Sequence, residues 1–140
     1  MKKIFLYSIL VVAVVASAIL VWEFVNYLDY SGKTLHESER WAVILDSHGD
    51  IISVETNSNE VWSALATMHQ DGSEMWIGGS VEEYGNHWGF RFNPDTINVA
   101  EITAEGAQTW IADISENTSY WMNTWSKETY VFARVTEIHA

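Results

Sequence analysis

The sequence contains no cysteine and a single proline, Pro94. Without cysteine the chain has no disulfide, no thiolate metal ligand and no cysteine nucleophile. A domain of this kind has to be held together by its hydrophobic core alone. The chain has 140 residues, which is enough for one such core and a small appendage.

Basic residues are also scarce. After residue 23 the chain has five Lys and Arg against eighteen Asp and Glu, a net charge of −13. Such a surface repels nucleic acid and anionic lipid headgroups, so we expect no nucleic-acid partner. Solubility is the plainest explanation of the acidity, and a cationic partner is the alternative.

Charge is absent from one long stretch near the N-terminus. Lys2 and Lys3 precede residues 4–22, which are uncharged. As a helix these nineteen residues would measure roughly 28 Å, close to the hydrocarbon thickness of a bilayer. We therefore predict a single-pass transmembrane helix, with a cytoplasmic N-terminus by the positive-inside rule. The alternative is a signal peptide cleaved near residues 16–18, which would give a secreted protein.

These patterns divide the chain into three parts. Residues 1–22 are predicted to be a membrane anchor or signal peptide, and residues 23–40 a juxtamembrane linker. Residues 41–140 are predicted to form an extracytoplasmic α+β domain, a small antiparallel sheet of five to six strands with one main helix.

Within that domain, the clearest helix signal covers residues 60–69. Asn and Ser residues at 57–59 can cap its start, and Gly72 can end it. Residues 41–45 and 51–54 predict a β-hairpin with a loop of about five residues. Further strands are expected at 75–81, 88–92, 97–102 and 130–135; residues 108–115 fit a helix or a strand, and 117–119 a loop.

The stretch from Gly78 to Glu105 carries the clearest strand pattern. Trp88, Phe90 and Phe92 alternate onto one strand face and are predicted to be core. The adjacent glycines at 78 and 79 suggest a bulge or a close approach of another backbone. Pro94 lies between Asn and Asp, which predicts a turn.

The order of these landmarks resembles a known family. A helix with a Trp and Leu face is followed by Gly79 to Val81, Tyr84-x-Asn86-x-Trp88, Phe90-x-Phe92-x-Pro94-Asp95 and Trp121-x-x-x-Trp125. Over roughly residues 54–138 the chain is similar to the small domain named after the N-terminal region of a calmodulin-binding protein. Members carry a Cys-Asp pair near Glu105-Gly106 and a Cys near Trp121, and this chain has neither.

The resemblance implies no activity, because the family has no settled one and offers no catalytic residues to carry over. Calmodulin is not an expected partner. Its targets are basic amphipathic helices, whereas this domain is acidic and is predicted to face away from the cytoplasm.

Aromatic residues near turns are the candidates for a binding surface. Trp121 and Trp125 lie in a loop-rich stretch next to Tyr120, and Tyr84 and His87 belong to a predicted turn. Tryptophan is enriched at protein interfaces, and flat aromatic faces also stack on ligands. We predict binding, by a protein or a carbohydrate, at these five residues.

Catalytic and metal sites find less support. His87 with Glu82, Glu83 and Asp95 matches no metal-ligand spacing, and exposed turn residues explain it better. Glu101 and Glu105 could be paired carboxylates for glycoside hydrolysis. They are four positions apart on a strand that leads into a turn, and this spacing is not specific to such a pair. We predict no catalytic residue, metal or cofactor.

The functional prediction is a membrane-anchored extracytoplasmic binding or accessory module that is not an enzyme. Such a module could be a small subunit of a membrane complex, with residues 4–22 in the membrane and another membrane or extracytoplasmic protein as partner. One alternative is carbohydrate or small-ligand binding at an aromatic cleft, and another is a small metal-dependent enzyme. Asn117 begins an Asn-Thr-Ser triplet and is a candidate for glycosylation.

Overall fold

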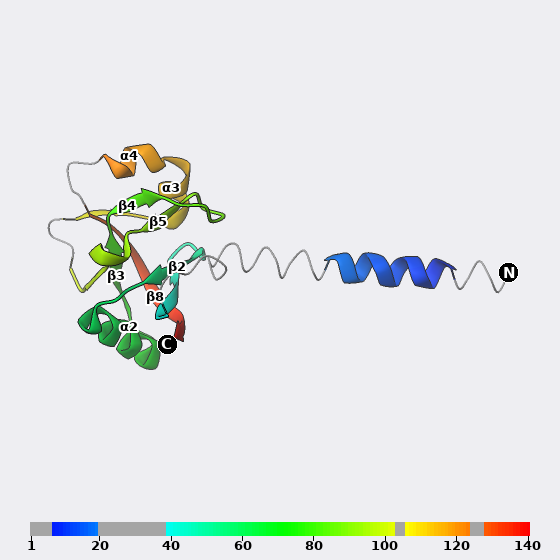
Figure 1. The fold of residues 1–140 in the computed structure, drawn as a ribbon, viewed down its shortest axis with the longest axis horizontal. Helices are drawn as coiled ribbons and strands as arrows, with labels where there is room; N and C mark the ends of the chain where they lie inside the picture. Colours follow the sequence, from blue (N-terminus) through cyan, green and yellow to red (C-terminus); the bar gives the residue numbers. More distant parts are fainter. Residues whose placement is uncertain (1–6, 20–38, 103–105, 124–127) are drawn as a thin grey trace.

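The computed structural model describes residues 7–19, 39–102, 106–123 and 128–140. From residue 39 onward these form a small α+β domain with a mainly antiparallel sheet (Figure 1). The elements in chain order are β1 (Trp41–Asp46), β2 (Ile51–Glu55), α2 (Asn59–Asp71), β3 (Glu74–Gly79), β4 (Val81–Glu83), β5 (Phe90–Phe92), η1 (Pro94–Thr96), β6 (Asn98–Ala100), β7 (Ala107–Thr109), α3 (Ile111–Glu116), α4 (Thr118–Met122) and β8 (Thr129–His139).

The long strand β8 organises the main sheet, whose order is β2-β1-β8-β3-β6. Along one edge of β8, β1 pairs antiparallel with residues 133–139, and β7 pairs parallel with residues 129–131. Along the other edge, β3 pairs antiparallel with residues 129–134. The end of β1 and the end of β7 therefore meet on the same side of β8, although they are far apart in the sequence.

The predicted hairpin and main helix are both confirmed. β1 and β2 pair antiparallel around a turn at residues 47–50. The Ser58 side chain accepts a hydrogen bond from the Val61 backbone N–H and caps the start of α2. Gly72 ends the helix at a φ of 68°, a left-handed conformation that favours glycine. Leu65 and Met68 form its buried side.

The core prediction is confirmed for Phe90 and Phe92, whereas Trp88 lies in the turn before the strand and is only half-buried against the core. Phe90 and Phe92 are fully buried on β5, which pairs with β4 in a separate two-stranded sheet. Trp88 precedes β5, and its indole N–H donates to the Ile51 carbonyl oxygen at 2.7 Å. The predicted strand at 75–81 is divided at Ser80, where the chain leaves the main sheet for the smaller one.

The glycine pair marks a close backbone approach, as predicted. A Cβ added to Gly78 would lie 1.9 Å from the Thr129 carbonyl oxygen of β8. One added to Gly79 would lie 2.6 Å from the Thr96 hydroxyl. No side chain fits at the first position without moving backbone, so glycine there allows β3 to pair with β8 at this register.

The segment with ambiguous periodicity contains both kinds of structure. Residues 107–109 form β7, and α3 begins at Ile111. The prediction of a loop at 117–119 is wrong, because α4 begins at Thr118 directly after Asn117. The Thr118 hydroxyl donates to the Ile114 carbonyl oxygen at 3.0 Å. The polar triplet therefore links two short helices and does not form a separate loop.

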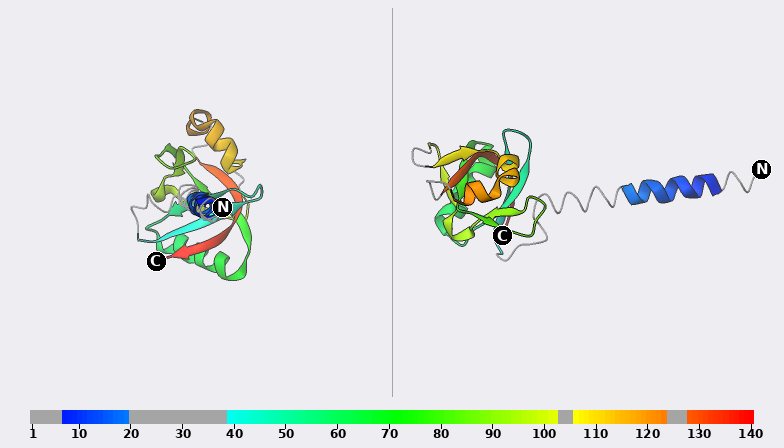
Figure 2. Two further views of the ribbon diagram at one scale, coloured as in Figure 1. Left: turned by 90° about the vertical axis from the view of Figure 1, so that its right-hand side faces the viewer. Right: turned by 90° about the horizontal axis from the view of Figure 1, so that it is seen from above.

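The main sheet has an inner and an outer face. Side chains of the inner face, such as Ile77, Val131 and Ala133, join a single hydrophobic cluster with residues from α2, β5 and α3. The views in Figures 1 and 2 place α2 at one end of the domain and α3 and α4 at the other. On the outer face, Trp76 and Phe132 alternate with these residues and are only half-buried.

The N-terminal helix corrects the membrane prediction. Within the described residues it covers residues 7–19. Across the described ranges, no helix is both long and apolar enough to span a membrane. The predicted transmembrane helix at 4–22, and the single-pass cell-membrane location derived from it, are therefore wrong. Residues 20–38, with most of the expected linker, lie outside the described residues.

Candidate functional site: an aromatic hollow on the outer face

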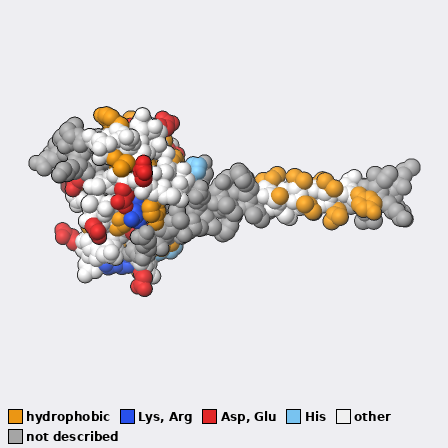
Figure 3. Space-filling view, turned by 45° about the horizontal axis from the view of Figure 1, so that its top comes forward, with side chains coloured by type: hydrophobic (Ala, Val, Ile, Leu, Met, Phe, Trp, Pro, Cys, Tyr) orange, Lys and Arg blue, Asp and Glu red, His pale blue; other side chains and the backbone are white. Residues whose placement is uncertain are grey.

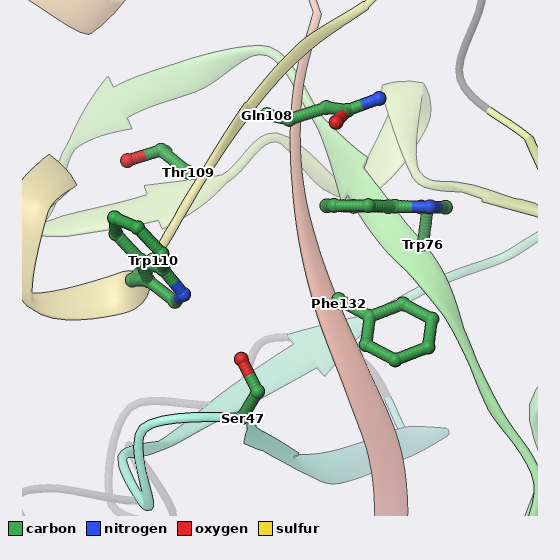
Figure 4. A pocket seen from close by; sticks show the side chains of 6 residues that line it. All are labelled: Ser47, Trp76, Gln108, Thr109, Trp110 and Phe132. Carbon is green, nitrogen blue, oxygen red and sulfur yellow. The ribbon is translucent and has the colours of Figure 1, made fainter.

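A hollow of about 420 Å³ opens on the outer face of the main sheet. We call it the aromatic hollow. Figure 4 shows that its side chains come from the β1–β2 turn, from β3 and β8, and from β7 and its junction with α3. The residues that line it are Ser47, Trp76, Gln108, Thr109, Trp110 and Phe132.

Two rings on neighbouring strands form one wall. Trp76 of β3 and Phe132 of β8 are directly opposed in the antiparallel ladder. Their ring centroids are 5.2 Å apart, at an interplanar angle of 52°. This distance and tilt lie within the range that aromatic pairs prefer. The ladder between the two strands therefore fixes the position of this wall.

Trp110 forms the opposite wall, across β8 from Trp76 in Figure 4. It lies between β7 and α3, and its side chain is 44% exposed. The imidazole of His48, in the β1–β2 turn, stacks on the indole with 4.2 Å between centroids and 15° between planes. A partly exposed tryptophan held by a stacked ring offers a large flat surface to a ligand.

The polar groups around the hollow are uncharged. Ser47, Gln108 and Thr109 line it, and among the lining residues in the described part of the chain there is no Asp, Glu, Lys, Arg or His. The Thr109 hydroxyl donates to an Asp113 carboxylate oxygen at 2.5 Å, which joins β7 to α3. The hollow therefore combines aromatic rings with neutral hydrogen-bonding groups.

The β1–β2 turn at the edge of the hollow carries two carboxylates, those of Asp46 and Asp50. Asp46 is 4% exposed, and its carboxylate accepts three backbone hydrogen bonds. Burial raises the pKa of Asp50 above the ordinary aspartate value of 3.8, and the neighbouring charge of Asp46 raises it further. The opposing effect of His48 is smaller.

The predicted turn residues Tyr84 and His87 lie elsewhere, beside β4 and β5. The Arg91 guanidinium stacks over the Tyr84 ring at 4.2 Å and pairs with Glu82 at 2.5 Å. His87 is exposed and meets the Trp88 ring edge-on at 5.2 Å. A shallow depression joins Tyr84 to Thr118 at the start of α4, so the two predicted patches are neighbours. This depression has one aromatic residue, whereas the aromatic hollow has three.

The second predicted patch is partly core. Tyr120 is 66% exposed on α4, but Trp121 is only half-exposed and packs against the hydrophobic cluster. The two rings meet edge-on at 5.0 Å. Trp121 is thus less exposed than expected, and its role in binding stays a prediction. Trp125 lies outside the described residues.

The remaining candidates stay as predictions. Asn117 is exposed, and its side-chain amide donates to the backbone and carboxylate oxygens of Asp113, each at 3.3 Å. Of the acids grouped with His87, Glu82 is paired with Arg91. In the residues that the structure describes, no three His, Asp or Glu side chains gather as metal ligands would. Glu105 lies outside those residues.

Trp76, Trp110 and Phe132 were missed as site residues by sequence reasoning. Trp76 was assigned only to a strand and Trp110 to an ambiguous segment, and tryptophans of both kinds are usually core. The signal that could have found them is alternation: Trp76 and Phe132 both stand on the face opposite a buried aliphatic neighbour. No family model, curated protein or solved structure matches this chain, so the family resemblance stays a prediction.

Proposed function

We propose that this protein is a binding module that is not an enzyme, and that the aromatic hollow binds a neutral carbohydrate. The observation that carries the proposal is the pairing of three exposed or half-exposed rings with three uncharged polar side chains around one hollow. Pyranose rings have apolar C–H faces and hydroxyl edges. Aromatic faces complement the former, and Ser, Thr and Gln side chains complement the latter.

Size and charge support this class of ligand. About 420 Å³ falls within the roughly 300–1,000 Å³ typical of small-molecule sites. The net charge of the chain, −12, disfavours anionic ligands, and acidic side chains are scattered over the face shown in Figure 3. The lining supplies no carboxylate to pair with a cation. A neutral ligand with a flat apolar face is the best match.

The lining also favours binding over catalysis. Hydrolysis of a glycosidic bond requires two carboxyl groups on either side of it. The described lining residues include none. The nearby Asp46 carboxylate is buried with its oxygens engaged by backbone N–H groups, and the Asp113 carboxylate accepts the hydrogen bond of the Thr109 hydroxyl. The predicted role as an accessory subunit, and the protein partner it requires, stay predictions because nothing in the structure tests them.

Titration calorimetry with cellobiose and maltose tests the proposal. We expect binding by the unaltered protein, weakened about threefold to tenfold in Trp110→Ala, since one aromatic contact contributes about 0.5–1.5 kcal/mol. Trp110 is 44% exposed, so the substitution should leave the fold intact.

Trp62→Ala is the matched control. Trp62 is a half-buried tryptophan on α2, covered by the Arg40 guanidinium and away from the hollow. Its loss should leave the affinity unchanged. If neither sugar binds at millimolar concentration, or if both variants lose affinity equally, the aromatic hollow is not a carbohydrate site.

A further inference from the structure

Asp46 connects two parts of the chain that carry opposite sides of the aromatic hollow. One carboxylate oxygen accepts hydrogen bonds from the backbone N–H groups of His48 and Asp50, each at 3.0 Å. The other accepts from the backbone N–H of Ile111, also at 3.0 Å, across 65 positions of sequence. One side chain thus holds the β1–β2 turn and the first residue of α3 together.

Both groups that it holds lead directly to lining residues. The turn presents Ser47 to the hollow. The backbone N–H of Ser47 donates to the Phe132 carbonyl oxygen at 3.2 Å. Ile111 follows Trp110 in the chain. His48, whose N–H is held by Asp46, places its ring on the Trp110 indole. The turn and the Trp110 wall are therefore fixed to each other twice, by the carboxylate and by the stacked rings.

The main sheet does not make this connection by itself. β1 and β7 pair with separate parts of β8, residues 133–139 and residues 129–131. Beyond the end of each strand, Ser47 and Trp110 stand on connecting segments. Burying a carboxylate is costly unless it is hydrogen-bonded, and these three backbone N–H groups supply the bonds that keep Asp46 in this position.

We propose that Asp46 is the positioning residue of the aromatic hollow, which sets Trp110 against the β1–β2 turn in the geometry that binds ligand. The part of this proposal that concerns affinity rests on the proposed function. The part that concerns the geometry of Trp110 does not. Asparagine at this position keeps one acceptor oxygen and loses the other, so it can hold the turn or α3 but not both.

The experiment compares Asp46→Asn with Asp50→Asn. Both remove one negative charge from the same turn, but only the first removes a hydrogen-bond acceptor from α3. In the protein without ligand, NMR measures the ring-current shift that the Trp110 indole imposes on the His48 imidazole protons. Calorimetry with cellobiose and maltose measures affinity. His48→Ala, an exposed position, serves as a second variant that leaves the carboxylate in place.

We expect Asp46→Asn to lose most of the His48 ring-current shift and to weaken sugar binding about threefold to tenfold, while Asp50→Asn changes neither. If Asp46→Asn does not fold, His48→Ala should still weaken binding by a smaller factor. The proposal is overturned if folded Asp46→Asn keeps the His48 ring-current shift, or if both Asp variants lose affinity equally. It is also overturned if Asp46→Asn does not fold and His48→Ala binds sugar with full affinity. If the unaltered protein binds neither sugar, the proposed function fails, and the His48 shift still decides the role of Asp46.

Discussion

The two faces of the main sheet are built from the same strands yet differ in residue type and exposure. On β8, Val131 and Ala133 are at most 1% exposed on the inner face, whereas Phe132 between them is half-buried on the outer face. On β3, Ile77 is fully buried and Trp76 is not. At these positions the inner face holds buried aliphatic residues, and the outer-face rings of Trp76 and Phe132 stay partly open to solvent. The strands therefore serve stability on one face and present a surface on the other.

The largest expected loss of stability comes from a substitution on the inner face. Ile77→Ala should lower the free energy of unfolding by about 3 kcal/mol, because it leaves a cavity in a fully buried position. Its neighbour Trp76→Ala should cost only about 1–2 kcal/mol, mainly the contact with Phe132. Urea unfolding of both variants measures the difference. Equal losses would mean that the two faces contribute alike to stability.

The second prediction concerns Gly78, an outer-face position where we expect substitution to be destabilising. Gly78 has the same strand parity as Trp76, and its Cβ would collide with the Thr129 carbonyl oxygen. Gly78→Ala should cost about 2 kcal/mol or more, since β3 and β8 must separate to admit a methyl group. Gly85→Ala, with no atom within 4 Å of the added Cβ, is the control and should change stability little. A shift in urea midpoint of similar size in both would contradict this account.

The smallest effect concerns the turn beside the hollow. Burial raises the pKa of Asp50, so the folded state disfavours its charged form. The cost is absent below pH 3.8, where the group is protonated in both states, and grows as the pH rises until the group is ionised in the folded state as well. Asp50→Asn should therefore stabilise the fold slightly at pH 7, within about 0.5 kcal/mol, and not at pH 3.

Thermal unfolding of both proteins across this pH range measures the difference between them. A gain that is the same at pH 3 and pH 7 would show that the asparagine acts through contacts and not through the lost charge.

Local signals predicted the local elements well. The Ser58 cap and Gly72 define α2 within the sequence itself, and the β1–β2 turn and the turn at Pro94 are fixed by residues close together in the chain. For the same reason the core residues Phe90 and Phe92 could be found from their alternation. These features depend on backbone and side-chain preferences that act over a few residues.

The site could not be predicted because β8 assembles it from distant segments. The wall formed by Trp76 and Phe132 exists only when β3 and β8 pair, and Trp110 joins them through β7. The same limit applies to the exposure of Trp121, which depends on where α4 packs. The membrane prediction rested on uncharged composition alone, and in the described residues no helix is both long and apolar enough to span a membrane.

The place of β8 in the chain has a consequence for how the protein folds during synthesis. All three strands that pair with it, β1, β3 and β7, precede it in the sequence. As the ribosome adds residues, the aliphatic faces of β1 and β3 emerge before the strand that joins them. The β1–β2 hairpin and α2 can form early from local contacts, but the sheet must wait for residues 129–139. Until then β1, β3 and β7 each have an edge without its β8 partner, and such edges are the sites where a chaperone or a misfolded neighbour can bind.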